Sequence, residues 1–193
     1  MFPVILDTNV LWSSRQRDFF LSLAAEGLYR PLWSTAILEE LHICEVEKLV
    51  RRGTSERDAE QRATWLISQM SESFSDSLVT GWEGLDGSFG LPDLNDEHLL
   101  TAAVVGGAGA IVTLNAKDLP LPLIPEGIEV LSPIEFATST TELDPFAALR
   151  AIEVIARRTG TQGPSLNVDQ LLDLLVSNYG FDSAVETIRN VRT

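Results

Sequence analysis

The feature that most constrains this chain is a series of short apolar segments that alternate with longer amphipathic ones. The first, Val4 to Leu6, is unbroken and contains β-branched residues, which is typical of a parallel strand buried on both faces. Further strands are predicted at residues 28–33, 78–80, 110–113 and 128–131. Helical periodicity covers residues 15–27, 35–52, 55–71 and 96–105. This alternation predicts an α/β fold with a doubly wound parallel sheet.

The strand pattern stops before the C-terminus. Composition shifts near Thr138–Thr141, a run of Thr and Ser, and only helices are predicted beyond it, over residues 145–158, 168–179 and 183–191. The first of these starts at Asp144-Pro145, because an acid suits the N-cap and a proline suits the first helical position. Asn167 and Asp182 are the expected caps of the other two. We therefore predict an α/β domain at residues 1–138 and a helical segment at residues 139–193.

Charge limits the possible functions. The 193 residues include 28 acids and 14 bases, a net charge of −14. A protein that binds nucleic acid passively is normally basic. Either nucleic acid is not the substrate, or metal cations and local basic patches offset the acidity at the site.

Apolar stretches and cysteine content bear on the compartment. The N-terminal apolar run reaches Asp7 after a few residues, so no signal peptide is predicted. The longest apolar stretch, Leu99 to Leu114, is too short for a membrane span and contains three glycines. The single cysteine, Cys44, excludes an intramolecular disulfide framework and a cysteine-based zinc site. We expect a cytoplasmic protein without membrane contact.

Acidic and amide side chains follow several predicted strands, where open α/β sheets place their sites. Asp7 closes the first strand, and Glu40 lies on the helix after the second. The remaining candidates near later strand ends are Asp93, Asp96, Asn115 and Asp118. If the strands are neighbours, the oxygen atoms of these side chains gather at one edge of the sheet.

Carboxylates that converge without a cation repel one another, at about 4 kcal/mol for a separation of ~4 Å and an effective dielectric near 20. A raised pKa or a divalent cation relieves this repulsion, and oxygen ligands select Mg²⁺ or Mn²⁺ over zinc. Each acid also has an ordinary structural interpretation. Asp7 suits a turn, Asp93 or Asp96 suits a helix cap, and Glu40 could pair with an arginine such as Arg17.

Two stretches resemble the signature motifs of PIN-domain nucleases. The first is Val4 to Leu11, and the second runs from Leu91 to Ala103 and continues from Ile111 to Leu119. Arg17-Asp18 and Trp33 to Leu41 resemble the VapC-type toxins of bacterial toxin–antitoxin pairs. The similarity spans about residues 2–137. It implies a PIN-like fold and a Mg²⁺- or Mn²⁺-dependent endoribonuclease that leaves 5′-phosphate and 3′-hydroxyl ends. It also implies RNA as the substrate, a cognate antitoxin as a partner, and a possible homodimer.

The resemblance also implies roles for individual residues. The catalytic set is Asp7, Glu40, Asp96 and Asn115. The metal ligands are Asp7, Asp96, Glu40 and the accessory Asp93. Charge and position, rather than the resemblance, make Arg17 and Lys117 substrate-binding candidates, together with Thr113. Asn115 stands where the family has an aspartate, and its amide supplies no charge. One well-held metal, with a second recruited by the substrate phosphate, therefore fits better than two fixed metals.

Two other functions compete with the nuclease. Asn115 favours a catalytically weak PIN-like interaction module, whereas the retained acids disfavour it. An aspartyl-phosphate phosphatase needs Asp-x-Asp after the first strand, and Asn9 occupies the second position here. The four tryptophans are of a type that stacks on bases, although core or interface packing is the preferred interpretation: Trp12, Trp33, Trp65 and Trp82.

Overall fold

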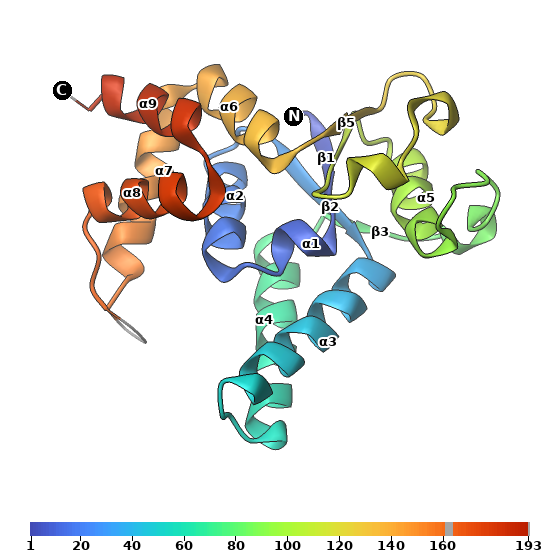
Figure 1. Cartoon of the computed structure of the whole chain (residues 1–193), viewed down its shortest axis with the longest axis horizontal. Coiled ribbons are helices and arrows are strands. Elements are labelled where there is room, and N and C mark those ends of the chain that lie inside the picture. The colour runs from blue at the N-terminus through green and yellow to red at the C-terminus, as the bar shows by residue number, and fades with distance from the viewer. Residues whose placement is uncertain (161–163, 193) are drawn as a thin grey trace. The chain divides into compact units, whose positions relative to one another are not determined.

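The structure is a computed structural model that describes residues 1–160 and 164–192. Within these residues, five parallel strands form one sheet in the order β3-β2-β1-β4-β5 (Figure 1). The strands are β1 (Pro3–Leu6), β2 (Arg30–Ser34), β3 (Leu78–Val79), β4 (Ala110–Val112) and β5 (Glu129–Leu131). The predicted α/β class and parallel sheet are confirmed.

The centre of the sheet is β1, whose residues Val4 to Leu6 are fully buried. It pairs with β4 in parallel, with Val4 opposite Ala110 and Leu6 opposite Val112. The chain adds β2 and β3 on one side of β1 and then returns to the other side for β4 and β5. This reversal creates a topological switch point at the carboxyl ends of β1 and β4, where ligand sites form in open α/β sheets.

The chain forms two compact units. The sheet unit comprises Pro3–Trp12 and Pro31–Val130. The helical unit comprises Met1–Phe2, Ser13–Arg30 and the described part of Leu131–Thr193. The domain boundary at residue 138 stays a prediction.

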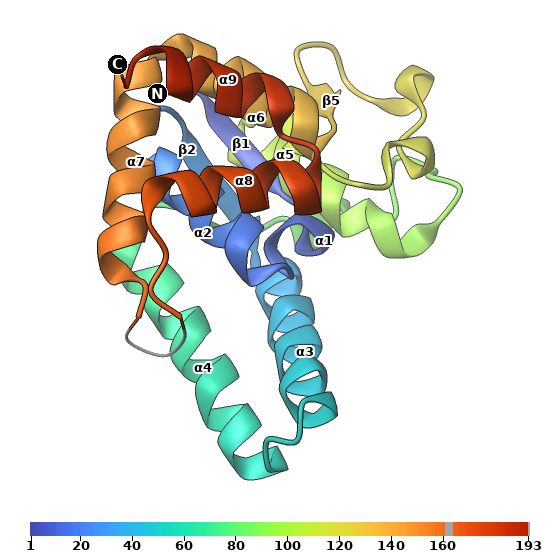
Figure 2. The ribbon, with the colours of Figure 1, turned by 60° about the vertical axis from the view of Figure 1, so that its left-hand side comes forward.

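The helices of the sheet unit are α1 (Thr8–Leu11), α3 (Thr35–Arg51), α4 (Glu56–Ser73) and α5 (Glu97–Gly106). Its 3-10 turns are η1 (Glu83–Leu85), η2 (Leu94–Asp96), η3 (Ala116–Asp118) and η4 (Leu121–Leu123). Ser34 caps α3 as predicted, because the Ile37 amide donates to its hydroxyl at 3.2 Å. A turn at Gly53 then reverses the chain, so α3 and α4 pack as an antiparallel pair (Figures 1 and 2).

Close packing at Gly106 brings the end of α5 against the sheet. A Cβ atom there would lie 2.8 Å from a Val79 methyl group and 3.0 Å from a Leu32 methyl group. Gly107 then ends the helix in the left-handed conformation, with φ of 63°. Gly106 is therefore a packing contact, and Gly107 ends the helix close to the predicted end at residue 105.

The helical unit consists of α2 (Ser14–Ala25), α6 (Pro133–Leu143), α7 (Pro145–Arg158), α8 (Val168–Tyr179) and α9 (Asp182–Asn190). Helix α2 contacts α6, α7 and α8, and α9 packs against these same three helices (Figure 2). Its core is aromatic: the Phe181 ring lies 5.8 Å from Phe19 and 5.6 Å from Phe20, and Phe20 lies 5.4 Å from Phe136. Among all described residues, no helix combines the length and apolar character needed to cross a membrane.

The helix α6 was not predicted. Its Thr- and Ser-rich end was interpreted as a composition shift, because these residues are poor helix formers. Two sets of hydrogen bonds stabilise the helix despite these residues. Ser132 and Glu135 form a capping box, and the Thr141 hydroxyl donates to the Ala137 carbonyl at 2.9 Å. The cap at Asn167 is confirmed, whereas Phe181 rather than Asp182 is the N-cap of α9.

Candidate active site

Asp7 lies at the carboxyl end of β1, at the switch point of the sheet. It is the N-cap of α1, and its amide bonds to the Val112 carbonyl of β4 at 3.1 Å. Its Oδ2 accepts from the Thr113 hydroxyl at 2.6 Å and from the Asn9 side-chain amide at 2.5 Å. These donors fix the carboxylate in one orientation. The turn interpretation of Asp7 is therefore correct, and it is compatible with a site.

Glu40 lies on α3 and turns toward the same sheet edge. Its Oε2 accepts from the Thr8 hydroxyl at 2.8 Å, and its Oε1 lies 3.2 Å from His98 Nε2 on α5. The partner that sequence reasoning suggested, Arg17, is replaced in this role by His98. His98 is largely buried, and its ring packs edge-on against Trp82.

The carboxylates of Asp93 and Asp96, near the start of α5, differ in their hydrogen bonds. Asp93 is exposed and caps η2, accepting from the Asn95 amide at 2.9 Å. Asp96 is the N-cap of α5, but within the described residues its carboxylate makes no capping hydrogen bond. The prediction that one of the two acids caps the helix at 96–105 is correct in position for Asp96, which makes no capping bond, whereas Asp93 caps the turn before it. The Asp96 carboxylate remains available to a ligand.

Glu97, which sequence reasoning missed, closes the loop before the acids. It is buried, and its two carboxylate oxygens accept from the Leu91 amide at 2.7 Å and the Phe89 amide at 3.1 Å. Two charge-assisted bonds to backbone amides hold this loop against the start of α5. The sequence signal was an acid beside Asp96 on an otherwise apolar helix.

The segment after β4 contributes Asn115, the fourth residue of the predicted catalytic set. Thr113 is buried and bonds to Asp7, and its hydroxyl also accepts from the Asn115 amide at 2.9 Å. This makes Thr113 a residue that orients Asp7. Asn115 and Lys117 are exposed and Asp118 is half-buried. Of the predicted substrate-binding residues, Lys117 is accessible to a ligand, whereas Arg17 is buried on α2 of the helical unit.

An open cleft of about 480 Å³ joins these residues. Four members of the predicted catalytic set line it, from β1, α3, the start of α5 and the segment after β4: Asp7, Glu40, Asp96 and Asn115. Its wall continues along α1 and α3 with Thr8, Asn9, Trp12, Cys44, Glu47, Lys48, Arg51 and Leu114. The cleft therefore has an acidic end at the sheet and a flank on α3 where Lys48 and Arg51 are paired with Glu45 and Glu47.

The acidic end carries unfavourable charge. Burial raises the pKa of Asp7, and the hydrogen bonds from Thr113 and Asn9 offset part of this effect. Burial and then the charge of neighbouring acids, with Asp7 first among them, raise the pKa of Asp96. Both carboxylates are thus harder to ionise than exposed aspartates. A bound cation would reverse this effect.

In the Glu40–His98 pair, by contrast, the charged form of the carboxylate is favoured. Burial disfavours the Glu40 carboxylate, but hydrogen bonds from His98 and Thr8 outweigh it and lower the pKa of Glu40. Burial also disfavours the imidazolium, yet Glu40 and then Asp7 raise the pKa of His98 above its ordinary value. Each partner therefore favours the charged form of the other. The pair fixes Glu40 without removing the excess negative charge around Asp7 and Asp96.

The fit of a metal ion can be judged from these donors. Residues 1–160 and 164–192 contain no group of three His, Cys, Asp or Glu side chains spaced to hold a metal. The chemistry of the donors nevertheless fits a divalent cation, because Asp7 and Asp96 present carboxylate oxygens whose ionisation is opposed by burial and neighbouring charge. The ligand roles of Asp7, Glu40, Asp93 and Asp96 stay predictions.

Comparison with known families agrees with this geometry. A family model described as "PIN domain" matches residues 3–117, more than half of the chain. The chain belongs to the PIN domain family, whose members are generally nucleases. The match begins at β1 and ends in η3, so it includes the whole acidic end of the cleft. No curated protein and no solved structure matches the chain.

Proposed function

We propose that the chain is a Mg²⁺- or Mn²⁺-dependent endoribonuclease and the toxin of a toxin–antitoxin pair. The observation that carries the nuclease part is the cleft itself. Asp7, Glu40, Asp96 and Asn115 come from four separate elements of a PIN domain and line one opening. A purely structural use of these acids gives no reason for placing them together at a site where two of them resist ionisation.

In the proposed reaction, a water oxygen forms a bond to phosphorus as the bond to the 3′ oxygen breaks. The 3′ oxygen takes a proton, so the products carry a 5′-phosphate and a 3′-hydroxyl. Mg²⁺ or Mn²⁺, held by Asp7 and Asp96 with help from Glu40 and Asp93, would activate the water and offset the charge of the phosphate. The net charge of −14 is then compatible with an anionic substrate.

The residues of the chain prepare the site for that chemistry. Thr113 and Asn9 orient the Asp7 carboxylate, and Thr8 and His98 orient Glu40. Prearranged groups avoid reorganisation during the reaction. Asn115 offers an amide at the exposed edge of the cleft. Because it adds no charge, we favour one well-held metal over two.

The toxin assignment rests on the resemblance to VapC-type proteins described above. The same proposal includes a cognate antitoxin as the protein partner, a cytoplasmic location and a possible homodimer. An apolar groove between α3 and α4, lined by Leu38, Ile43 and Ile67, is a candidate surface for the antitoxin.

The test is RNA cleavage by the purified chain in Mn²⁺, in Mg²⁺ and in EDTA. We expect cutting of RNA in either metal and none in EDTA, with 5′-phosphate ends on the products. Single-stranded DNA of the same sequence, run in parallel, checks the choice of RNA. Cutting that persists in EDTA would contradict the metal dependence, and cutting of DNA alone would contradict the substrate.

A second candidate is an interaction module with weak or no catalysis. Asn115 at the fourth position favours it. Under this alternative, no metal-dependent cleavage occurs and partner binding survives loss of the acids. Expression of the chain in wild type and in the Asp7→Asn variant, each without and then with the product of an adjacent small gene, separates the two, because an antitoxin relieves growth arrest. Growth arrest that only wild type causes supports the toxin, whereas equal behaviour of both supports the module.

A further inference from the structure

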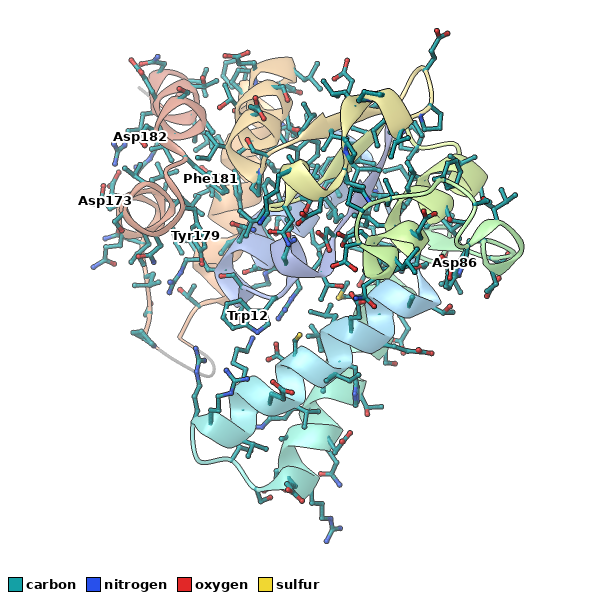
Figure 3. All side chains as sticks on the ribbon, turned by 45° about the vertical axis from the view of Figure 1, so that its right-hand side comes forward. Trp12, Asp86, Asp173, Tyr179, Phe181 and Asp182 are labelled. Carbon is teal, nitrogen blue, oxygen red and sulfur yellow. The ribbon has the colours of Figure 1, made fainter. Side chains whose placement is uncertain are left out.

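Trp12 is a large aromatic residue that the proposed chemistry does not use. It directly follows α1, close to α3 (Figure 3), and lines the same cleft as Asp7 and Asp96. It is 45% exposed, so of the two packing roles expected for the tryptophans, core or interface, it does not have the first. Core packing is correct for Trp33 and Trp82, which are buried. Trp12 thus presents aromatic surface to whatever enters the acidic cleft.

The position of Trp12 is fixed. Its amide donates to the Thr8 carbonyl at 2.8 Å, and its own carbonyl accepts from Lys48 Nζ at 3.1 Å. The Lys48 ammonium group lies 6.0 Å from the centre of the indole ring and is paired with Glu45. Lys48 is itself buried. The backbone of Trp12 is held by these bonds and its ring is contacted by Lys48, so the residue is partly ordered before a ligand covers it.

A basic group lies on the same wall of the cleft. Arg51 follows Lys48 by one turn of α3, and its exposed guanidinium group pairs with Glu47 at 2.6 Å. An exposed pair of this kind contributes little to stability. A phosphate can therefore take the place of the Glu47 carboxylate, and Arg51 suits a phosphate well because its donors form a fork.

The spacing along α1 relates Trp12 to the acids. Asp7 and Trp12 are the two caps of this helix, five positions apart, which at about 1.5 Å per residue spans ~7.5 Å. Stacked nucleotides in one strand are about 3.4 Å apart. The axial separation of the two caps is thus comparable to the length of a few stacked nucleotides in one strand.

We propose that Trp12 is a stacking platform for an unpaired base of the RNA substrate, with Arg51 contacting the phosphate backbone beside it. The proposal rests on the nuclease function above and narrows its substrate class. A base inside a duplex has both faces covered by its neighbours, so only a single-stranded segment, a loop or a bulge can use the platform. The cleft then selects RNA that is unpaired close to the cut.

The test compares Trp12→Ala with Trp12→Phe and with Trp65→Ala, in the intact chain. Trp65 is the matched control, since it is 61% exposed on α4 and lies outside the cleft. Affinity for a fluorescein-labelled oligoadenylate is measured by anisotropy in Ca²⁺, with a gel to show that the RNA stays intact. We expect Trp12→Ala to bind about tenfold more weakly, within the range for one lost base stack. Trp12→Phe should retain most of the affinity and Trp65→Ala all of it.

A scan with abasic nucleotides in the RNA distinguishes a base contact of Trp12 from a purely structural role of this residue. One abasic nucleotide placed at successive positions should weaken binding to wild type at a single position and have no such effect on Trp12→Ala. The stacking proposal would be overturned by any of three results: equal RNA binding by wild type and Trp12→Ala, equal losses of affinity in both abasic scans, or no RNA binding at all. Duplex RNA of the same sequence should not distinguish the variants.

The outcomes separate this proposal from the proposed function. If binding depends on Trp12 but no metal supports cleavage, the platform stands and the nuclease fails. If RNA is cut and Trp12→Ala has the KM and kcat of wild type, the nuclease stands and the platform fails.

Discussion

The two units of the chain use charged side chains in opposite ways. In the helical unit, Arg189 on α9 pairs with Asp173 on α8 at 2.6 Å, at the protein surface (Figure 3). In the sheet unit, Asp7 and Asp96 share a cleft in which burial and neighbouring acids raise the pKa of each. The first arrangement serves the packing of two helices. The second lowers stability, which folded proteins tolerate mainly where a site requires it.

The largest contrast is expected in catalysis. Asp7→Asn keeps the shape of the side chain but removes its charge, so RNA cleavage should fall about 100-fold or more. Asp173→Asn removes a carboxylate of the helical unit and should leave the rate within about twofold, because an exposed ion pair contributes little. Initial rates in Mn²⁺ on one labelled RNA measure both. Equal losses in the two variants would mean that the cleft is not the site.

The next effect concerns stability and the aromatic core of the helical unit. Phe181→Ala empties the centre of its aromatic core and should lower the free energy of unfolding by about 3–5 kcal/mol. Phe146→Ala, at a residue that is 60% exposed, is the control and should change it by less than about 0.5 kcal/mol. Urea unfolding followed by circular dichroism measures both. Similar midpoints for the two variants would show that Phe181 is not central to the core.

The loop that Glu97 closes links stability to the site. Glu97→Gln replaces one accepting oxygen with an amide that faces the backbone donors of Phe89 and Leu91, at a cost of about 1–3 kcal/mol. Hydrogen exchange at these two amides should accelerate. Glu83→Gln, at an exposed position in η1, should leave both exchange rates unchanged. Unchanged exchange in Glu97→Gln would show that the loop is held by other contacts.

The smallest effect follows from the raised pKa of Asp96. A folded-state pKa above the ordinary 3.8 means that the folded chain holds this proton more tightly, so the associated stability is present below pH 3.8 and is lost as the pH rises through the folded pKa. At pH 7 and without metal, Asp96→Asn should therefore raise Tm by about 1–3 °C. The gain should vanish below pH 3.8. Thermal melts in EDTA across this range test the sign, and a lower Tm at pH 7 would contradict it.

Local sequence predicted the parts of the fold in which short segments determine their own conformation. Val4 to Leu6 forms the central strand because an unbroken apolar run suits only a strand buried on both faces. Asp7 and Ser34 occupy their expected places because strand ends and helix caps are local features. The helix α6 was missed because its stability depends on a capping box and on hydroxyl bonds within the helix, which outweigh the poor propensity of its Thr and Ser residues.

The partners of the acids could not be predicted in the same way. His98 meets Glu40 only because α5 and α3 converge at one sheet edge, and a helix pattern alone does not show which side chain faces that edge. The exposure of Trp12 likewise depends on how α1 meets α3. The sequence motifs thus indicated which acids to consider. The structure adds the side chains that orient them and the wall along which a substrate would lie.

The most direct test of the central claim is calorimetric titration of Mn²⁺ into the metal-free chain and into its Asp96→Asn and Asp173→Asn variants. If the cleft is a metal-dependent site, wild type and Asp173→Asn should bind one Mn²⁺ per chain with the same affinity, and Asp96→Asn should bind it at least about tenfold more weakly. Equal Mn²⁺ affinity in all three proteins, or no Mn²⁺ binding by any of them, would contradict it.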